Sequence, residues 1–193
     1  MNFNLILLGN DSDYIHEFAD SIFSISKFNN LISLPNIRKD TNNRFYSKEY
    51  LSRALFYEDI EGKIEHNNII IPGNSSNNTI KEIASYTRTA SKVNNRCFIV
   101  GILSSSYLNY CERFAKMKMT NHRTKVPDTM IGNTLLGEKE FISRQESIEE
   151  NHYNNFFKCS SFIYRTDEDV VTNTLLFTNF CIDKQFKIIL KEE

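Results

Sequence analysis

Short continuous apolar runs recur along the chain, separated by turn signals and by longer stretches with helical spacing. Runs of strand length that do not alternate with polar residues are typical of parallel strands covered on both faces. Gly9-Asn10 ends the first run, and Pro72-Gly73 ends the third. The predicted strands are residues 3–8, 31–34, 68–71, 96–103, 161–165 and 185–190.

Between these runs, apolar residues return every three or four positions, which predicts amphipathic helices. Residues 15–23 follow this spacing, and Asp11 or Ser12 is placed to cap that helix. Strands and helices that alternate without a linker or repeat predict a single domain over residues 1–193. Its fold class is α/β, a three-layer, mainly parallel sheet flanked by helices. Further helices are predicted at 47–62, 77–93, 106–117, from Val126-Pro127 onward, and at 167–180.

The charge balance and the apolar runs narrow the possible functions. With 23 basic and 24 acidic residues the net charge is -1, which excludes a uniformly basic nucleic-acid coat but leaves room for a local basic patch. No run approaches the ~20 apolar residues that cross a bilayer, and the first residues carry no leading Lys or Arg. We therefore expect a cytoplasmic protein without a membrane partner.

The residue usage indicates the kind of genome that encodes the chain. Asn is unusually frequent, with 23 residues against 6 Gly and no Trp, which is typical of translation from AT-rich DNA. This predicts a phage or a low-GC microbe, with the host cytoplasm as location if a phage encodes the protein. The cysteines form no C-x-x-C pair, so we expect reduced thiols and no metal site. They are Cys97, Cys111, Cys159 and Cys181.

Three segments in order carry a family likeness. NLILLGNDSDYIHEFADSIF reads as a strand, a short loop and a helix, and NNIIIPGNSSNNTIKEIASYTRTASK as a second such unit. RCFIVGILSSSYLNYCERFAKMKMTNHRTKVPDTMI reads as a third strand, a basic lid-like stretch and a helix entered through Val-Pro. Together they resemble the P-loop kinases of the polynucleotide kinase and zeta-toxin type. The resemblance spans residues 3–150, is best over 68–131, and implies a P-loop kinase-like fold.

The phosphate loop of that family is missing. A G-x-x-x-x-G-K-[ST] loop turns backbone N–H groups toward phosphate, while its Lys neutralises phosphate oxygens and its Ser or Thr binds Mg²⁺. The chain has no such match, and two carboxylates in the loop would repel phosphates. The two carboxylates belong to Asp11 and Asp13, and their alternative roles are helix capping, which is favoured, and metal binding. The degenerate phosphate loop consists of Gly9, Asn10, Asp11, Ser12 and Asp13.

Other residues of the chain stand where the resemblance implies functional residues of such kinases. Asp40, in NIRKD, stands where the resemblance implies the carboxylate that accepts the proton of the attacking hydroxyl. Five positive charges fall within residues 113–125, and Arg suits phosphate because its planar fork matches the oxygens. The alternatives are a solvated turn for Asp40 and a solvated helix end for the basic stretch. The candidate phosphate-binding or nucleic-acid-binding residues are Arg113, Lys116, Arg123 and Lys125.

Three hypotheses follow from these residues. The first is a catalytically degenerate P-loop kinase-like protein that acts as a binding or accessory factor for a protein partner, without a cofactor. The second is an active nucleotide or polynucleotide kinase with a non-standard phosphate site, which would use Mg²⁺ and ATP. The third is a structural or host-interaction protein of unrelated α/β topology. In that case residues 3–8 would not lie centrally beside the strands at 68–71 and 96–103.

Overall fold

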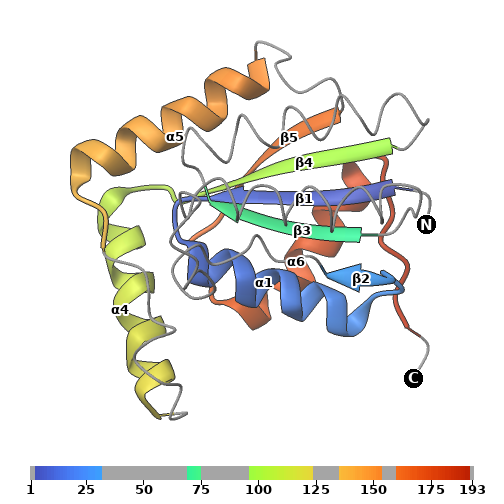
Figure 1. Cartoon of the computed structure of the whole chain (residues 1–193), viewed down its shortest axis with the longest axis horizontal. Helices are drawn as coiled ribbons and strands as arrows, with labels where there is room; N and C mark the ends of the chain where they lie inside the picture. Colours follow the sequence, from blue (N-terminus) through green and yellow to red (C-terminus); the bar gives the residue numbers. More distant parts are fainter. Residues whose placement is uncertain (1–2, 32–68, 75–95, 124–134, 154–159, 192–193) are drawn as a thin grey trace, which may run out of the picture.

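The protein folds around a five-stranded, wholly parallel sheet in the order β2-β3-β1-β4-β5 (Figure 1). The computed structural model describes residues 3–31, 69–74, 96–123, 135–153 and 160–191. The strands are β1 Phe3–Gly9, β2 Asn30–Leu31, β3 Ile69–Asn74, β4 Arg96–Leu103 and β5 Ser160–Arg165. The helices are α1 Ser12–Ile25, α4 Tyr107–Arg123, α5 Glu138–Tyr153 and α6 Val170–Asp183.

Strand β1 is the centre of the sheet. All seven of its residues are buried, and Leu5 pairs with Ile70 of β3 on one side and with Phe98 of β4 on the other. A strand with neighbours on both edges and cover on both faces needs a mainly apolar sequence, and Leu5–Leu8 supplies it, with the buried Asn4 as the polar exception. The predicted fold class is confirmed. The central position of β1 between β3 and β4 also shows that the hypothesis of unrelated topology is wrong.

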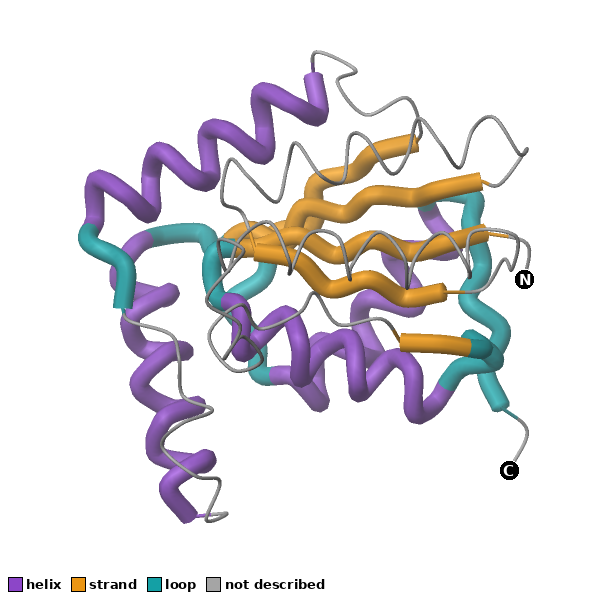
Figure 2. The backbone as a smooth tube through the Cα atoms, in the orientation of Figure 1, coloured by secondary structure: helices purple, strands orange, loops and turns teal. Residues whose placement is uncertain are grey.

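Helices α1 and α6 cover one face of the sheet, and their contact forms the main core (Figure 2). The predicted stripe on α1 is confirmed, because Ile15, Phe18 and Ile22 are all buried. The ring of Phe18 meets that of Phe177 on α6 edge-on, with centroids 5.1 Å apart. Each such side chain stabilises the fold by roughly 1.5–3 kcal/mol through burial, so this layer fixes α6 against α1.

Helix α5 lies on the opposite face, over β4 and β5. Successive strand residues point to opposite faces, so Val100 and Ile102 join the α1–α6 core while Gly101 faces α5. A Cβ at Gly101 would lie 2.4 Å from Cγ2 of the buried Ile148 and 3.1 Å from Cδ1 of Ile163. The glycine therefore allows α5 to approach the sheet closely.

Several predicted element boundaries are wrong. Strand β3 continues through Pro72 and Gly73 to Asn74 instead of ending at residue 71, and α6 spans Val170–Asp183 rather than 167–180. Residues 185–190 are not a strand of the sheet: Phe186 and Ile188 are buried in the core, and the segment makes a single antiparallel bridge, Ser26 to Leu190. Because alternate side chains of this segment are buried, its sequence resembles that of a strand, although the segment does not pair with any strand of the sheet. Helix α4 continues to Arg123 rather than ending at residue 117, because no Gly or Pro interrupts it. Residues 32–34 and the predicted helices at 47–62 and 77–93 lie outside the described residues, as does the Val126-Pro127 helix start.

We predict that Gly101→Val destabilises the protein by about 1–3 kcal/mol, since the added methyl groups overpack the α5 interface. Urea unfolding measures the change. Gly137→Ala is the matched control, because nothing lies within 4 Å of a Cβ placed at Gly137. Equal stability of the two variants would contradict the close packing of α5 on β4.

Burial also predicts how stability depends on alkaline pH. Burial raises the pKa of the Cys97 thiol to about 12, and it raises the pKa of Cys181 as well. In the unfolded chain both thiols ionise near pH ~8.5. The stability that the protonated buried thiols provide is therefore complete below that pH and is lost as pH rises toward the folded-state values.

We therefore expect the urea midpoint to fall between pH 9 and 11, with each thiol contributing up to ~1.4 kcal/mol per pH unit. Cys181→Ala should show a shallower decline than the wild-type protein over the same interval. Parallel declines for the two proteins would show that Cys181 does not titrate with unfolding.

Candidate functional site

The carboxyl ends of the parallel strands meet at one edge of the sheet, where α1, α4 and α5 begin (Figure 1). From β1 the chain passes to β2 and β3 on one side, and then crosses to β4 and β5 on the other. In open α/β sheets ligands bind outside the carboxyl ends at such a switch point. This edge is therefore the candidate functional site.

The connection between β1 and α1 is very short, with only Asn10 and Asp11 between Gly9 and Ser12. Asp11 is the N-cap of α1: its Oδ1 accepts a hydrogen bond from the backbone N of Tyr14 at 3.0 Å, and the residue is buried. The predicted capping role of Asp11 is confirmed. A Cβ at Gly9 would lie 2.7 Å from Cδ1 of Ile15, so the glycine serves tight packing of the turn against α1.

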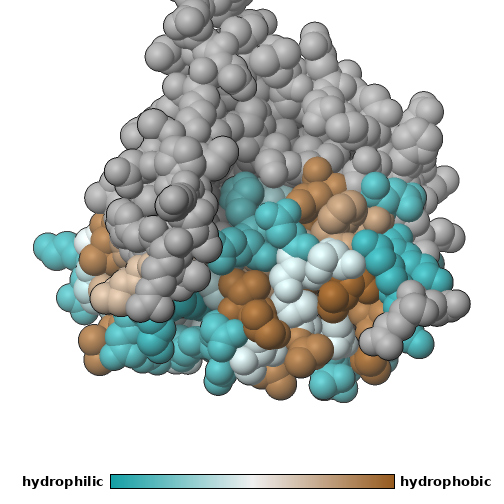
Figure 3. Space-filling view, turned by 90° about the horizontal axis from the view of Figure 1, so that it is seen from below, coloured by the Kyte–Doolittle hydropathy of each residue, from teal (hydrophilic) through white to brown (hydrophobic). Residues whose placement is uncertain are grey.

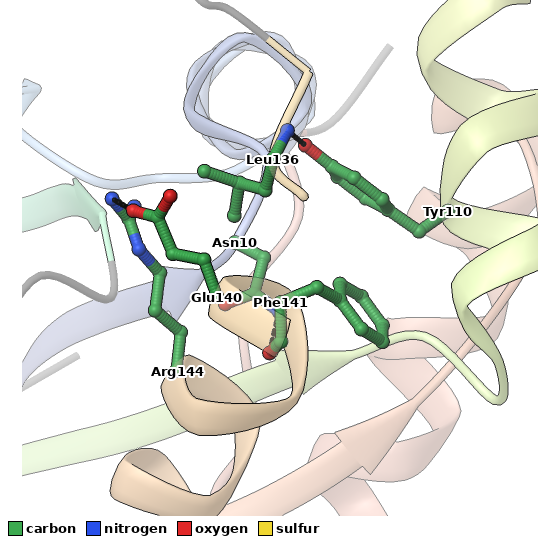
Figure 4. A network of polar contacts seen from close by, with 6 residues as sticks. All are labelled: Asn10, Tyr110, Leu136, Glu140, Phe141 and Arg144. Atoms are coloured by element: carbon green, nitrogen blue, oxygen red, sulfur yellow. Dashed lines mark hydrogen bonds and ion pairs between the residues drawn. The ribbon is translucent and has the colours of Figure 1, made fainter. Parts of the chain in front are cut away.

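The first turn of α5 closes over this connection (Figure 4). The Asn10 side-chain amide donates to the carbonyl oxygen of Phe141 at 3.3 Å. The hydroxyl of Tyr110, on α4, accepts from the backbone N of Leu136 at 3.2 Å, and the Tyr110 and Phe141 rings stack with centroids 5.0 Å apart. Helix α5 is thus joined to both the β1–α1 turn and α4.

A second contact joins α5 to the end of β4. The side-chain amide of Gln145 accepts from the backbone N of Ser104 at 3.0 Å and donates to the Ser104 carbonyl at 3.3 Å. These two bonds satisfy backbone groups that the strand leaves unpaired where it ends. The ends of β1 and β4 are therefore both covered by α5.

Arg113 connects the remaining elements of the edge. It is only 7% exposed, its Nη1 donates to the Thr166 carbonyl at 3.1 Å, and its Nη2 donates to Ser104 Oγ at 2.9 Å. Its guanidinium carbon lies 4.0 Å from the centroid of the Tyr14 ring, a cation–π contact. One buried cation thus bonds the ends of β4 and β5 and packs against α1.

Tyr14 extends the same network to the β5–α6 loop. Its hydroxyl donates to the Glu168 carbonyl at 3.0 Å and accepts from the side-chain amide of Asn173 at 2.7 Å. Burial raises the pKa of Tyr14, although the nearby charge of Arg113 acts in the opposite direction. The phenol is therefore neutral at physiological pH and can donate.

A cavity of ≈ 450 Å³ opens beside this network, between α1, α4 and residues 167–171. Burial raises the pKa of Asp167, but hydrogen bonds from Ser105 and Asn109 outweigh it and the net shift is downward. Bonds from Thr172 lower the pKa of Asp169. Both carboxylates are ionised at neutral pH, so acidic groups dominate the lining. The charged lining residues are Glu17, Glu112, Asp167, Glu168 and Asp169 against Arg113 and Lys116.

The structure brings together only part of the predicted site. Arg113 is buried, so the solvated-helix-end interpretation is wrong for it, whereas Lys116 is exposed and lines the cavity. Arg123 is the last residue of α4, and Ser12 and Asp13 begin α1. Asp40 and Lys125 lie outside the described residues.

Three residues that organise the edge escaped the sequence analysis: Tyr14, Gln145 and Thr166. No sequence motif marks them, because each acts through a partner distant in the chain. Among the described residues, no group of three or more His, Cys, Asp or Glu side chains is placed to hold a metal ion. No described helix has the length and apolar character to span a membrane.

One of three comparisons with known proteins, the search of solved structures, supports the fold. No protein-family model matches the chain, and no curated protein matches it. Among solved structures, the tunicamycin resistance protein of Deinococcus radiodurans is similar with a TM-score of 0.57 at 8% identity, over 97% of this chain and 98% of that one. A de novo designed P-loop fold protein matches with a TM-score of 0.42 at 7% identity, over 97% and 99% of the two chains. The likeness to the resistance protein shows that this chain shares its α/β fold, a parallel sheet flanked by helices.

We predict that Arg113→Met destabilises the protein by about 3 kcal/mol, because the Thr166 carbonyl and the Ser104 hydroxyl lose a charged donor. Lys116→Met, one turn away on the exposed side of α4, should change stability by less than ~0.5 kcal/mol. Chemical denaturation compares the two variants. A similar small effect for both would show that Arg113 does not hold the edge together.

Proposed function

We propose that this protein is a P-loop kinase-like binding or accessory factor that does not transfer phosphoryl groups. The observation that carries the proposal is the closed β1–α1 connection. Asp11 occupies the N-terminus of α1, and Asn10 is bonded to the first turn of α5. In this fold class, that position is where a phosphate loop would hold a nucleotide.

The residues at this position do not fit Mg²⁺ and a nucleoside triphosphate. Phosphate binding at a helix N-terminus uses backbone N–H groups and the positive end of the helix dipole. Here the carboxylate of Asp11 already accepts from the N–H of Tyr14 and adds a negative charge. The chain also supplies no lysine between Gly9 and Asp13 to neutralise phosphate oxygens. A triphosphate would have to displace the cap and meet like charge in a partly buried site.

The charges that line the cavity beside the β1–α1 turn also disfavour binding of a nucleotide. Acidic residues outnumber basic ones in its lining, and the lining residue Arg113 already gives both terminal nitrogens to protein acceptors. An anionic nucleotide would therefore enter a field of unfavourable sign. A partner or ligand that is not a polyphosphate is more compatible with these groups.

The test is thermal stability with and without Mg²⁺ together with ATP, GTP or dNTPs. A ligand at ~100 times its dissociation constant stabilises the folded state by about 2.7 kcal/mol, which is several degrees of melting temperature for a chain of this size. We expect no shift with any nucleotide and no transfer of labelled phosphate above a buffer blank. A shift of several degrees, or measurable transfer, would favour the active kinase instead.

A separate experiment tests whether the protein acts as an accessory factor for a protein partner. The tagged protein, purified from cells of its source under mild conditions, should retain a stoichiometric protein partner. Arg113→Met tests whether the partner depends on the ordered edge, with Lys116→Met as the control variant. Purification without any associated protein would count against the accessory role, even if nucleotide binding is absent.

A further inference from the structure

The cavity between α1, α4 and residues 167–171 has both apolar and charged walls. Its volume of ≈ 450 Å³ lies in the range of small-molecule sites, and it opens at the edge of the sheet where ligands bind in open α/β folds. Met117, Val170 and Val171 form the apolar part of the lining. Viewed from below, the side on which Figure 1 places α1 and α6, apolar and hydrophilic patches of the described residues lie next to each other (Figure 3). The cavity can therefore hold the apolar body of a ligand together with a charged group.

The charged part of the lining is mainly acidic, with five carboxylates against two cations. Some of these carboxylates already have protein donors: both oxygens of Asp167 accept hydrogen bonds, at 3.0 and 2.9 Å, and both oxygens of Asp169 accept from Thr172. Glu112 and Glu168 are exposed, and their carboxylates make no hydrogen bond or ion pair with another described residue. These two carboxylates, one on α4 and one in the β5–α6 loop, are available to a ligand.

An organic cation fits this lining better than a metal ion does. A divalent metal ion needs several oxygen ligands arranged around one point. Among the described residues, no group of three or more acidic, His or Cys side chains is so placed. An ammonium group instead donates up to three separate hydrogen bonds and is attracted by the excess of negative charge. The lining therefore favours an amine.

Arg113 adds a requirement for an acceptor. Its side chain is only 7% exposed and lines the cavity. Both terminal nitrogens donate to protein oxygens, whereas the buried Nε has no hydrogen-bond partner among the described residues. A buried donor without an acceptor is destabilising, so an oxygen of the ligand on this side of the cavity would be favourable. Because the lining is already acidic, a neutral carbonyl or hydroxyl oxygen suits it better than a carboxylate.

We propose that this cavity binds a small organic amine that carries an ammonium group, a neutral oxygen acceptor and an aliphatic body. The ammonium group faces Glu112 and Glu168, the oxygen faces Arg113, and the aliphatic body packs against Met117 and Val171. The inference rests on the proposed function in one respect, namely that the ligand of this edge is not a polyphosphate. It adds the chemical class of the ligand.

Titration with leucinamide, which combines the three features, tests the proposal. At about pH 6.5 its α-amine is protonated. NMR spectra of the isotope-labelled protein should show saturable shifts at the backbone amides of residues 109–117 and 167–171, with a dissociation constant in the millimolar range. Isocaproamide lacks the ammonium group, isopentylamine lacks the carbonyl, and leucine has a carboxylate in place of the neutral amide. Each of these three analogues should bind more weakly than leucinamide.

Charge-neutralising variants locate the ammonium group. Glu112→Gln and Glu168→Gln should each raise the dissociation constant of leucinamide roughly threefold to fivefold, the effect of one exposed charge pair. Glu146→Gln is the matched control, because it removes the same charge from an exposed position of α5 outside the cavity, and it should bind like the wild-type protein. Equal weakening by all three variants would show unspecific attraction and would overturn the proposal.

Other outcomes would also contradict it. These are the absence of saturable shifts, equal binding of isocaproamide or isopentylamine, and the same shifts with Mg²⁺ alone, which would indicate a metal site. A parallel titration with ATP and Mg²⁺ separates the two proposals. Shifts with ATP would refute the proposed function, whereas no shift with either leucinamide or ATP would refute only the amine site.

Discussion

The buried guanidinium of Arg113 is the constraint on which the functional edge depends. Removing a cation from water is costly unless acceptors surround it, and here a strand-end carbonyl, a hydroxyl and an aromatic face do so. The ionised Asp167 lies close enough for Arg113 to lower its pKa further, so a counter-charge is present. The loops after β4 and β5 therefore cannot separate without exposing unsatisfied groups, and this fixes one wall of the cavity.

The same edge shows how the chain closes the carboxyl ends of its parallel strands. A parallel sheet leaves backbone groups and helix N-termini unpaired at its carboxyl edge, and a kinase uses them to bind a ligand. Among the described residues, several of these groups have internal partners: Asp11 caps α1, and the side-chain amides of Asn10 and Gln145 bond to backbone groups. Function cannot be taken from the fold alone, since these internal partners occupy the usual binding groups.

The sequence predicts best those elements in which the pattern of apolar and polar side chains matches a single kind of burial. Strands β1 and β4 are mainly apolar, helix α1 has an apolar stripe, and Asp11 is a local cap within three residues of its partner. Helix α5 is poorly delimited because residues 138–153 are mostly polar and only Phe141 and Ile148 are buried core positions. The role of Arg113 was not predictable, because its acceptor at Thr166 is 53 residues away and its charge suggests a solvated or phosphate-binding residue.

Rigidity at the edge and exposure on α6 are connected. Helix α6 begins at the Asp169 cap, in the loop that Arg113 and Tyr14 hold, and Phe177 packs its inner face against Phe18. The outer face is therefore presented on a helix that is already ordered at its start and along its length. Binding to such a surface loses little conformational entropy, so a modest apolar area can suffice for association. Helix α6 is thus held at its start by the Asp169 cap and along its inner face by the contact of Phe177 with Phe18, while side chains such as Val171 and Leu175 stay exposed.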